Sequence, residues 1–322
     1  MNSAGTVIAV LAWLAAGWGT AGSQAAAGNG DMWLDHVPIA VHDLARATIA
    51  YRKLGFTVRP GRSHPNTIAN AFVSFSNGTQ LELITATERG DSLASWYVDF
   101  LKSHEGPAFV ALGVDSITLA EDRLRAAGIE FHDTGPEPDG FRTVTLEVPE
   151  PFRRLFLIHY AAAPRRNPAG HRHPNTAVGM RTVWIAVDDM MEASAWMVRL
   201  GFRAGHVVPL QRINGLGREF RLGEGGSVVL VAATDISGIT ANRLVTVGPG
   251  IMGVTLEVTD LGATVEAVRS GTGRHFVVTA EPDGSGQSLL VPPRFTGGVW
   301  LEFRQPPASP PSPAPAPPST SP

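Results

Sequence analysis

Histidines and carboxylates are the side chains in this sequence that could perform chemistry, because the chain contains no cysteine. Without cysteine there is no thiolate nucleophile or thiolate metal site, so any metal ion must rest on His, Asp or Glu. Three such residues stand inside apolar, strand-like segments: His36 in LDHVPIAVHDL, Glu82 in QLELI and Glu302 in WLEF. Each also has an ordinary explanation. His36 can be a hydrogen-bonded strand histidine, and either carboxylate can lie on the solvent side of an alternating strand.

Other histidines occur in turn-like sequence. The tetrapeptide HPNT occurs at 64–67 and again at 173–176, outside the register of the longer repeat in the chain. Pro-Asn is typical of turns, so we predict a structural turn at both copies. The tract HRH at 171–173 lies in a segment rich in proline and glycine, which would not fix ligand geometry. We interpret these as surface histidines.

An internal repeat must position these candidates. Four strand-like segments are each followed by a polar turn and an amphipathic helix pattern. Their anchor residues Val41, Val114, Val187 and Val258 follow one another at a nearly constant interval along the sequence. Short strand patterns follow each helix, so each unit is predicted to be β-α-β-β-β. Units of this length indicate two domains of two units each rather than a repeat array.

The helix patterns carry start and stop signals. Asp43 and Asp189 stand at the N-cap positions of the first and third helix patterns. Gly55, Gly128 and Gly201 recur at the interval of the repeat, where a left-handed C-terminal residue is needed. The repeat is therefore expected to hold at the level of helix boundaries.

The 322 residues divide accordingly. We expect a first domain over 33–162, a linker over 163–178 and a second domain over 179–304. The net charge of −3 is too small and too evenly spread to attract nucleic acid. A soluble globular protein without a nucleic-acid partner is expected.

The two ends of the chain differ from its middle. An apolar run over 6–19 is followed by small residues, which predicts a signal peptide over 1–27, a periplasmic or secreted protein, and no membrane attachment after processing. Met32 directly precedes the first predicted strand, which leaves open a cytoplasmic protein that starts there. The segment 305–322 is half proline, which predicts a disordered, polyproline-like tail.

The βαβββ units, the opening LDHVPIAVHDL and the later GTQLELI resemble the vicinal oxygen chelate superfamily, specifically its glyoxalase-like members. The resemblance covers nearly all of Trp33 to Arg304. It implies an α+β fold of two domains with cupped mixed sheets. It also implies a divalent metal ion in the cup, held by the first and last strands of each unit. Such an ion would assist a lyase or isomerase acting on a small substrate with vicinal oxygens.

The resemblance assigns metal positions unit by unit. It places His36 and Glu82 in the first unit and Glu302 in the fourth. The remaining positions hold residues that are not expected to bind a metal: Phe109, Phe156, Thr182, Gly253, and Val228 or Leu230. If the first and fourth units share a cup, then His36, Glu82 and Glu302 form a facial metal site.

If instead the first two units share a cup, it holds only His36 and Glu82. A third ligand must then come from elsewhere, such as His104 or His159. In either case Glu82 and Glu302 are the candidate catalytic carboxylates. The sequence does not decide the pairing.

The resemblance also marks residues that would contact a substrate. The residues expected to line the cup are His64, Asn70, Phe109 and Phe156. Trp96 is expected to join them, because the apolar spacing over 91–104 predicts a helix over the open side of the sheet. Because Phe109 and Phe156 replace metal ligands with apolar surface, a second function competes with the enzyme. The cup would then bind a small, antibiotic-like molecule without turnover. A homodimer is left open.

Overall fold

The computed structural model describes residues 32–63, 67–136, 140–161, 172–223, 226–281 and 286–307. The predicted signal peptide, His64, most of the predicted linker and nearly all of the proline-rich tail lie outside these residues. Within the described ranges, no helix is both long enough and apolar enough to cross a membrane.

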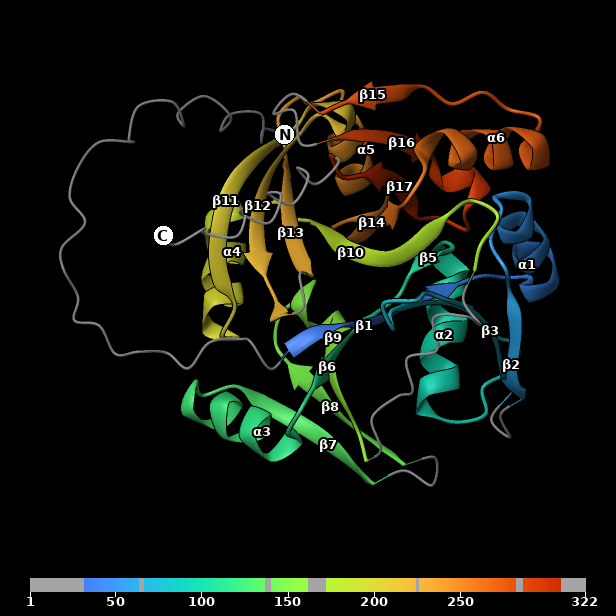
Figure 1. The fold of residues 1–322 in the computed structure, drawn as a ribbon. Helices are drawn as coiled ribbons and strands as arrows, with labels where there is room; N and C mark the ends of the chain where they lie inside the picture. The colour runs from blue at the N-terminus through green and yellow to red at the C-terminus, as the bar shows by residue number, and fades with distance from the viewer. Residues whose placement is uncertain are drawn as a thin grey trace, which may run out of the picture.

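Two curled mixed sheets form the body of the molecule, with helices packed around them (Figure 1). Sheet A contains, in spatial order, β2 (Arg59–Ser63), β3 (Ile68–Ser74), β4 (Gln80–Ala86), β1 (Met32–Ala40), β6 (Val110–Val114), β9 (Leu155–Tyr160), β8 (Phe141–Glu147) and β7 (Glu130–Pro136), and the short β5 (Gly106–Pro107) pairs with β1. Sheet B contains β11 (Arg203–Leu210), β12 (Gly215–Arg221), β13 (Ser227–Ala233), β10 (Ala177–Ala186), β14 (Gly250–Val258), β17 (Trp300–Gln305), β16 (Gln287–Val291) and β15 (Val278–Ala280).

Helices connect these strands. The α-helices are α1 (Leu44–Lys53), α2 (Ser92–Ser103), α3 (Ile117–Ala126), α4 (Met190–Arg199), α5 (Ile239–Val247) and α6 (Leu261–Thr272). The short 3-10 turns are η2 (Phe152–Arg154), η4 (Gln211–Ile213) and η6 (Pro293–Phe295).

The first strand of each repeat lies at the centre of its sheet. In sheet A, β1 pairs with β4 in parallel and with β6 antiparallel. In sheet B, β10 pairs with β13 in parallel and with β14 antiparallel. The first repeat therefore shares a sheet with the second, and the third with the fourth. The expected α+β fold is confirmed, and the open question of which repeats share a sheet is answered.

The helix boundaries follow the predicted signals. The carboxylate of Asp43 accepts a hydrogen bond from a backbone N–H in the first turn of α1, and Asp189 does the same for α4. Gly55, Gly128 and Gly201 have φ angles of 83°, 64° and 92°. A left-handed backbone of this kind strongly favours glycine, which explains why the three glycines keep the register of the repeat.

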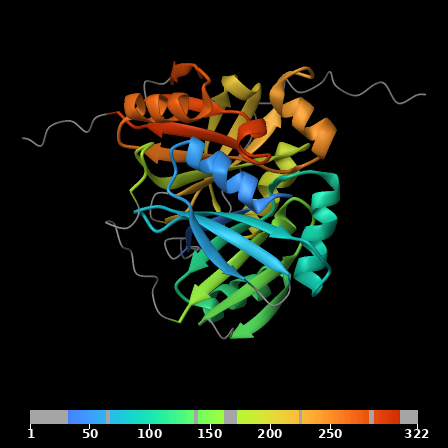
Figure 2. The same cartoon turned by 90° about the vertical axis from the view of Figure 1, so that its right-hand side faces the viewer.

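One continuous hydrophobic core joins the two sheets. The rings of Phe56 and Phe303, from the first and fourth repeats, stack with centroids 5.6 Å apart. The hydroxyl of Tyr51 in α1 donates a hydrogen bond to the carbonyl oxygen of Thr296, 3.0 Å away. Helices α1 and α6 lie side by side at this junction (Figures 1 and 2). The two sheets thus pack as parts of one body.

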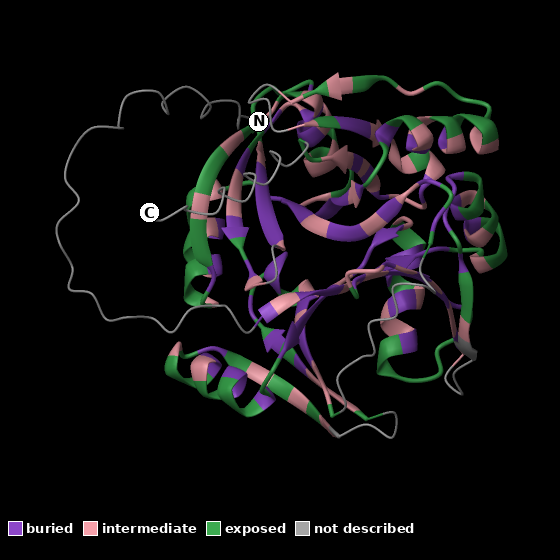
Figure 3. Cartoon of the chain, viewed as in Figure 1, coloured by how far each residue is buried: buried purple, intermediate pink, exposed green. Residues whose placement is uncertain are grey.

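Each sheet has a second face that points away from this core. Face A is the side of sheet A that carries His36, Glu82, Phe109 and Phe156. It supports a smaller apolar cluster with α2. Face B is the equivalent side of sheet B and packs against α5. Figure 3 shows the buried strands between half-buried and exposed helix surfaces. The candidate functional residues of the described chain lie on these two faces.

Candidate functional site

A bulge in β1 builds the polar part of face A. The side chains of Leu34 and Val37 both lie in the main core although they are three positions apart. The pairing of β1 with β6 shifts register between Leu34 and His36. A bulge inserts one extra residue and re-aims the neighbouring side chains. Asp35 and His36 can therefore both lie on the side of β1 away from the core.

Strand register identifies the positions in the four repeats that are equivalent to Glu82. The residues on the first and last strands of each repeat are opposed as Pro38 and Glu82, Ala111 and Phe156, Trp184 and Val229, and Thr255 and Glu302. Phe156 and Glu302 therefore stand where the sequence comparison placed them. In the third repeat the equivalent residue is Val229, rather than Val228 or Leu230.

Face A brings both of its repeats into one site. The Nε2 atom of His36 lies 3.6 Å from Oε2 of Glu82. The His36 and Phe156 rings meet edge to face, with centroids 5.8 Å apart. Phe156 in turn lies 6.2 Å from Phe109. Half of this site is polar and half is phenyl surface.

The imidazole of His36 lies between two carboxylates. Its Nδ1 atom is 2.6 Å from Oδ1 of Asp35, and its Nε2 atom faces Glu82. The side chains of His36, Asp35 and Glu82 are 14%, 9% and 11% exposed. A carboxylate on one ring nitrogen fixes the orientation of the ring and directs the other nitrogen toward the site.

The protonation of His36 follows from these neighbours. Burial alone would lower the pKa of His36. The hydrogen bond to Asp35 and the charges of Asp35 and Glu82 outweigh burial and raise that pKa above 6.5. The hydroxyl of Tyr160 also donates to Oδ1 of Asp35, at 2.9 Å. Burial and the charge of Asp35 raise the pKa of Tyr160, so this hydroxyl keeps its proton.

Asn70 supports Glu82 from the neighbouring strand β3. Its Nδ2 atom donates a hydrogen bond to Oε1 of Glu82 over 2.7 Å. Its Oδ1 atom is buried without a hydrogen-bond partner among the described residues. The amide is therefore oriented to serve the carboxylate, although this leaves its own acceptor unsatisfied.

Helix α2 extends the apolar half of face A. The ring of Trp96 lies 4.3 Å from that of Phe109, so α2 covers part of the sheet as expected. The guanidinium of Arg154 lies 5.9 Å from the centre of the Trp96 ring. Nε of Arg154 forms an ion pair with Oε2 of Glu150 at 2.9 Å. The charge of Arg154 is thus offset by a carboxylate, whereas the neighbouring Arg243 donates to the backbone carbonyl oxygens of Gly248 and Ile251.

Face B holds Glu302 in a separate network. Oε2 of Glu302 accepts a hydrogen bond from the Thr255 hydroxyl at 2.8 Å, and that hydroxyl accepts one from Nε1 of Trp184 at 3.1 Å. Nη1 of Arg212 lies 3.6 Å from Oε1 of Glu302. Burial raises the pKa of Glu302, although the hydrogen bond from Thr255 opposes this.

The facial set His36, Glu82 and Glu302 is therefore not assembled, because Glu302 lies on a different sheet. The indole of Trp184 fills the space beside Gly253. A Cβ atom on that glycine would lie 2.6 Å from the indole. Face B is packed with protein side chains where the superfamily carries metal ligands.

The donor set on face A does not fit a resident divalent ion. His36 and Glu82 supply two ligand atoms, and the two equivalent positions are phenyl rings. The carboxylate of Asp35 is already bonded to Nδ1 of His36 and to the hydroxyl of Tyr160. Of the other histidines considered, His159 bonds through Nδ1 to the carbonyl oxygen of Val114 at 3.0 Å, and His104 packs 4.5 Å from the ring of Phe100. Among the residues that the structure describes, no three or more His, Asp or Glu side chains form a metal-binding group. Sites of this kind use about three or four protein ligands.

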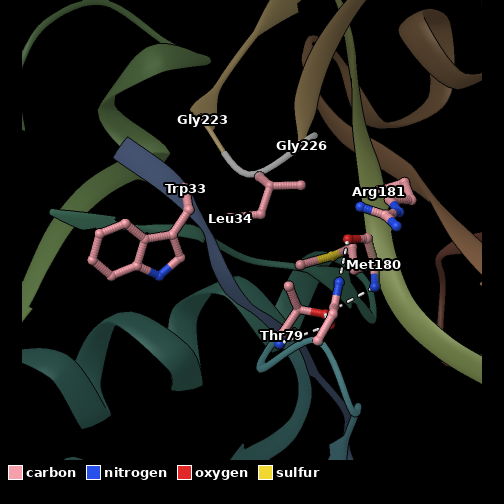
Figure 4. A pocket seen from close by; sticks show the side chains of 8 residues that line it. Trp33, Leu34, Thr79, Met180, Arg181, Gly223 and Gly226 are labelled. Atoms are coloured by element: carbon pink, nitrogen blue, oxygen red, sulfur yellow. Dashed lines mark hydrogen bonds between the residues drawn. The ribbon is translucent and has the colours of Figure 1, made fainter. Parts of the chain in front are cut away.

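A cavity of about 310 Å³ lies at the junction of the two sheets rather than on face A (Figure 4). Its lining includes Trp33, Leu34, Thr79, Met180, Arg181 and Gly226. The backbone N–H of Met180 donates to the hydroxyl of Thr79 at 2.8 Å, so the turn before β4 is fixed onto β10. Arg181 is already paired with Glu257. The residues that line this cavity therefore hold the two sheets together.

The second HPNT copy has a structural role. The Nδ1 atom of His173 accepts a hydrogen bond from the N–H of Thr57 at 3.0 Å, and Nε2 donates to the carbonyl oxygen of Ser74 at 3.1 Å. The backbone N–H of Thr176 bonds back to the carbonyl oxygen of His173 at 2.9 Å, which confirms a turn. The interpretation of His173 as a surface histidine was wrong, because its side chain is buried between the sheets.

Sequence reasoning missed Asp35 and Tyr160. Asp35 directly precedes His36, where a regular strand would point it into the core, and only the bulge brings it to face A. Tyr160 is distant in sequence from both. A polar residue next to His36 in an apolar strand was the available signal.

Comparison with known proteins agrees with this geometry. Residues 34–201 match the family described as glyoxalase-like domain. A triple mutant of 4-hydroxymandelate synthase from Streptomyces coelicolor is similar in structure, with a TM-score of 0.62 and 14% identity over 86% of this chain and 92% of that one. A hypothetical protein from Staphylococcus aureus gives a TM-score of 0.57 and 10% identity over 85% of this chain and 99% of that one.

At these identities the two structures indicate the fold alone. No protein of curated function matches the chain in sequence. The family match covers just over half of the 322 residues. Together with the two curled mixed sheets, it shows that the chain belongs to the glyoxalase-like domain family of the vicinal oxygen chelate superfamily.

Proposed function

We propose that face A binds a small organic molecule. The apolar part of the molecule packs on Phe109, Phe156 and Trp96, and its polar end meets His36 and Glu82. One observation carries the proposal: the four positions of face A that the repeat makes equivalent gather as two polar and two phenyl side chains. Small-molecule sites are mostly apolar surfaces with a few placed polar groups.

A neutral aromatic alcohol, 3-phenylpropanol, tests this binding in the full chain. We expect it to shift the NMR signals of the Trp96 indole and the His36 ring. Phe109→Ser should weaken binding by about tenfold, since burial of a phenyl ring contributes roughly 1.5–3 kcal/mol. Phe276→Ser, in the fourth repeat and away from face A, is the matched control. Equal binding by both variants would contradict the proposal.

The metal content of the purified protein tests whether face A has too few ligands to hold a resident divalent ion. A glyoxalase-type lyase with a resident ion should contain about one divalent ion per chain. We expect far less than one from elemental analysis of protein purified without a histidine tag, after incubation with Mn²⁺, Ni²⁺ and Zn²⁺. A stoichiometric ion that is lost in both His36→Ala and Glu82→Ala would instead support the metal-assisted enzyme.

Proton transfer is a second candidate function for the same residues. Glu82 is held by Asn70 as an acceptor, and the raised pKa of His36 provides a proton donor 3.6 Å away. The carboxylate would take a proton from a carbon next to a carbonyl group while the imidazolium donates to the oxygen, as in an isomerase. Deuterium incorporation from D₂O into 4-phenyl-2-butanone measures this step. Loss of the catalysed exchange in Glu82→Gln would support it, and the same slow exchange with and without the wild-type protein would exclude it for this ketone.

We also propose that the chain is exported. The support is the apolar run and the small residues that follow it in the sequence. N-terminal sequencing of the native protein should give a start near residue 28, whereas a start at Met32 would contradict export.

A further inference from the structure

The polar end of face A carries more negative than positive charge. Asp35 and Glu82 are both buried. Among the described residues, the cationic group within ion-pair distance of either carboxylate is His36. Two carboxylates and one imidazole sum to a net charge of −1 when the ring is protonated and −2 when it is neutral, so this end of the face is negative in both states. A buried charge without a partner is unfavourable unless a cation matches it.

Glu82 also has unused capacity to accept hydrogen bonds. Its Oε1 atom accepts one bond from Asn70. Its Oε2 atom is 3.6 Å from Nε2 of His36, which is longer than a hydrogen bond. A carboxylate has about four acceptor positions. An N–H donor from a ligand would satisfy this oxygen, whereas a ligand carboxylate or enolate would be repelled by it.

The rings beside Glu82 suit an organic cation better than a metal ion. Phe156 meets His36 edge to face, Phe109 lies next to Phe156, and Trp96 lies next to Phe109. Aromatic faces attract ammonium groups, especially where water is excluded. A metal ion would need oxygen or nitrogen donors at the positions that these phenyl rings occupy.

We propose that the ligand of face A is an amine: a molecule whose protonated nitrogen is held by Glu82 and whose aromatic or alkyl body packs on Phe109, Phe156 and Trp96. This inference rests on the proposed binding function and names the ligand class. It differs from the superfamily expectation of vicinal oxygens on a metal ion. The charge of Arg154 beside Trp96 is offset in part by Glu150, and no arginine of the described residues lies within ion-pair distance of Glu82.

Three molecules with one skeleton test the proposal: 3-phenylpropylamine, 3-phenylpropanol and 3-phenylpropanoate. Their affinities for the full chain are measured by NMR titration at pH 7, at fixed ionic strength. We expect the amine to bind about tenfold or more tighter than the alcohol, and the carboxylate to bind weakest. In Glu82→Gln the ratio of amine affinity to alcohol affinity should fall to within about threefold, because the charge that distinguishes the two ligands is gone.

The control is Glu266→Gln, which removes the same charge from an exposed residue of α6 that pairs with Arg269. It should keep the full preference. If amine and alcohol bind equally well, and Phe109→Ser weakens both, the amine proposal is overturned while the binding function stands. If none of the three binds, or if Phe109→Ser changes nothing, both are overturned.

A metal ion is the remaining alternative source of positive charge. Mn²⁺ or Zn²⁺ alone, titrated into the chain, should bind weakly and without change in Glu82→Gln. Saturation at one ion per chain that is lost in Glu82→Gln, together with competition against the amine, would overturn the proposal in favour of a metal site.

Discussion

His36 has a neighbouring carboxylate on each side of its ring, and Asp35 is the nearer of the two. The hydrogen bond to Asp35 is a main reason for the raised pKa of His36. The protonation of His36 is therefore linked to the stability of the folded protein. A group with a raised folded pKa stabilises the protein below its unfolded pKa. That stabilisation is lost as pH rises through the folded value. For His36 the loss falls in a window above pH 6.5.

Asp35→Asn should lower the pKa of His36, because an amide removes the negative charge that favours the imidazolium. NMR titration of the His36 ring protons measures this directly. The destabilisation by Asp35→Asn should also be larger at pH 6 than at pH 9 in urea unfolding. Asp122→Asn, at an exposed carboxylate of α3 that pairs with Arg125, should leave both quantities unchanged. An unchanged His36 pKa in Asp35→Asn would contradict this account.

At the residue scale, the resemblance to glyoxalase-like proteins indicated His36 and Glu82, and the repeat register carried these positions over to Phe109 and Phe156 in the second repeat. The polar side chain of Asp35 in an apolar strand was a signal, but strict alternation points the residue before His36 into the core. The bulge that reverses this depends on the pairing of β1 with β6, which is not a local property of the sequence.

At the element scale, the repeat is most visible at helix starts. In α4 the carboxylate of Asp189 accepts from the backbone N–H groups of Met191 and Glu192, at 2.8 and 3.0 Å. These donors have no partner inside the helix, so the cap supplies one. Helices and strands were predictable because caps, glycines and apolar spacing act over short stretches of chain.

Asp189→Ala should lower the free energy of unfolding by about 1 kcal/mol, because both backbone donors lose their acceptor. Asp189→Asn is the matched control, since asparagine caps helices about as well as aspartate. Urea unfolding followed by circular dichroism measures the difference. Equal losses in the two variants would mean that the charge of Asp189, rather than its cap, stabilises α4.

The pairing of whole repeats could not be predicted, because all four begin with similar apolar strands and the choice between them is made by long-range packing. The surroundings of Glu302 could not be predicted either, because they too depend on long-range packing. Its strand pattern resembles that of Glu82, yet its site is filled by Trp184 beside Gly253.

At the scale of the whole molecule, the second HPNT segment ties the two sheets together. Asn175 is fully buried; its Nδ2 atom donates to the carbonyl oxygen of Leu54 at 2.9 Å, and its Oδ1 atom accepts from the N–H of Ala177 at 3.2 Å. Turn chemistry predicted a turn here, but a short polar motif does not reveal what the turn packs against.

Asn175→Ala should destabilise the protein by roughly 2–4 kcal/mol, because it leaves two buried backbone groups without partners. Unfolding should also lose cooperativity, since this residue connects the first repeat to the start of β10. The urea midpoint and slope report both effects. Asn242→Ala, at an exposed position of α5, should change neither. A single, unshifted transition in Asn175→Ala would show that the sheets are joined by other contacts.

The contact between α1 and α6 gives the sharpest test of how closely the two halves pack. A Cβ atom on Gly271 of α6 would lie 1.9 Å from the carbonyl oxygen of Lys53 at the end of α1. In an isolated helix, Gly→Ala stabilises by about 1 kcal/mol. Here Gly271→Ala should reverse that sign and destabilise by about 1–3 kcal/mol, because the backbone of α1 must move away. Ser270→Ala, on the exposed side of the same turn, should change stability little. If thermal unfolding shows that Gly271→Ala is the more stable protein, then the two helices are not in close contact in solution and the shared core is looser than this packing requires.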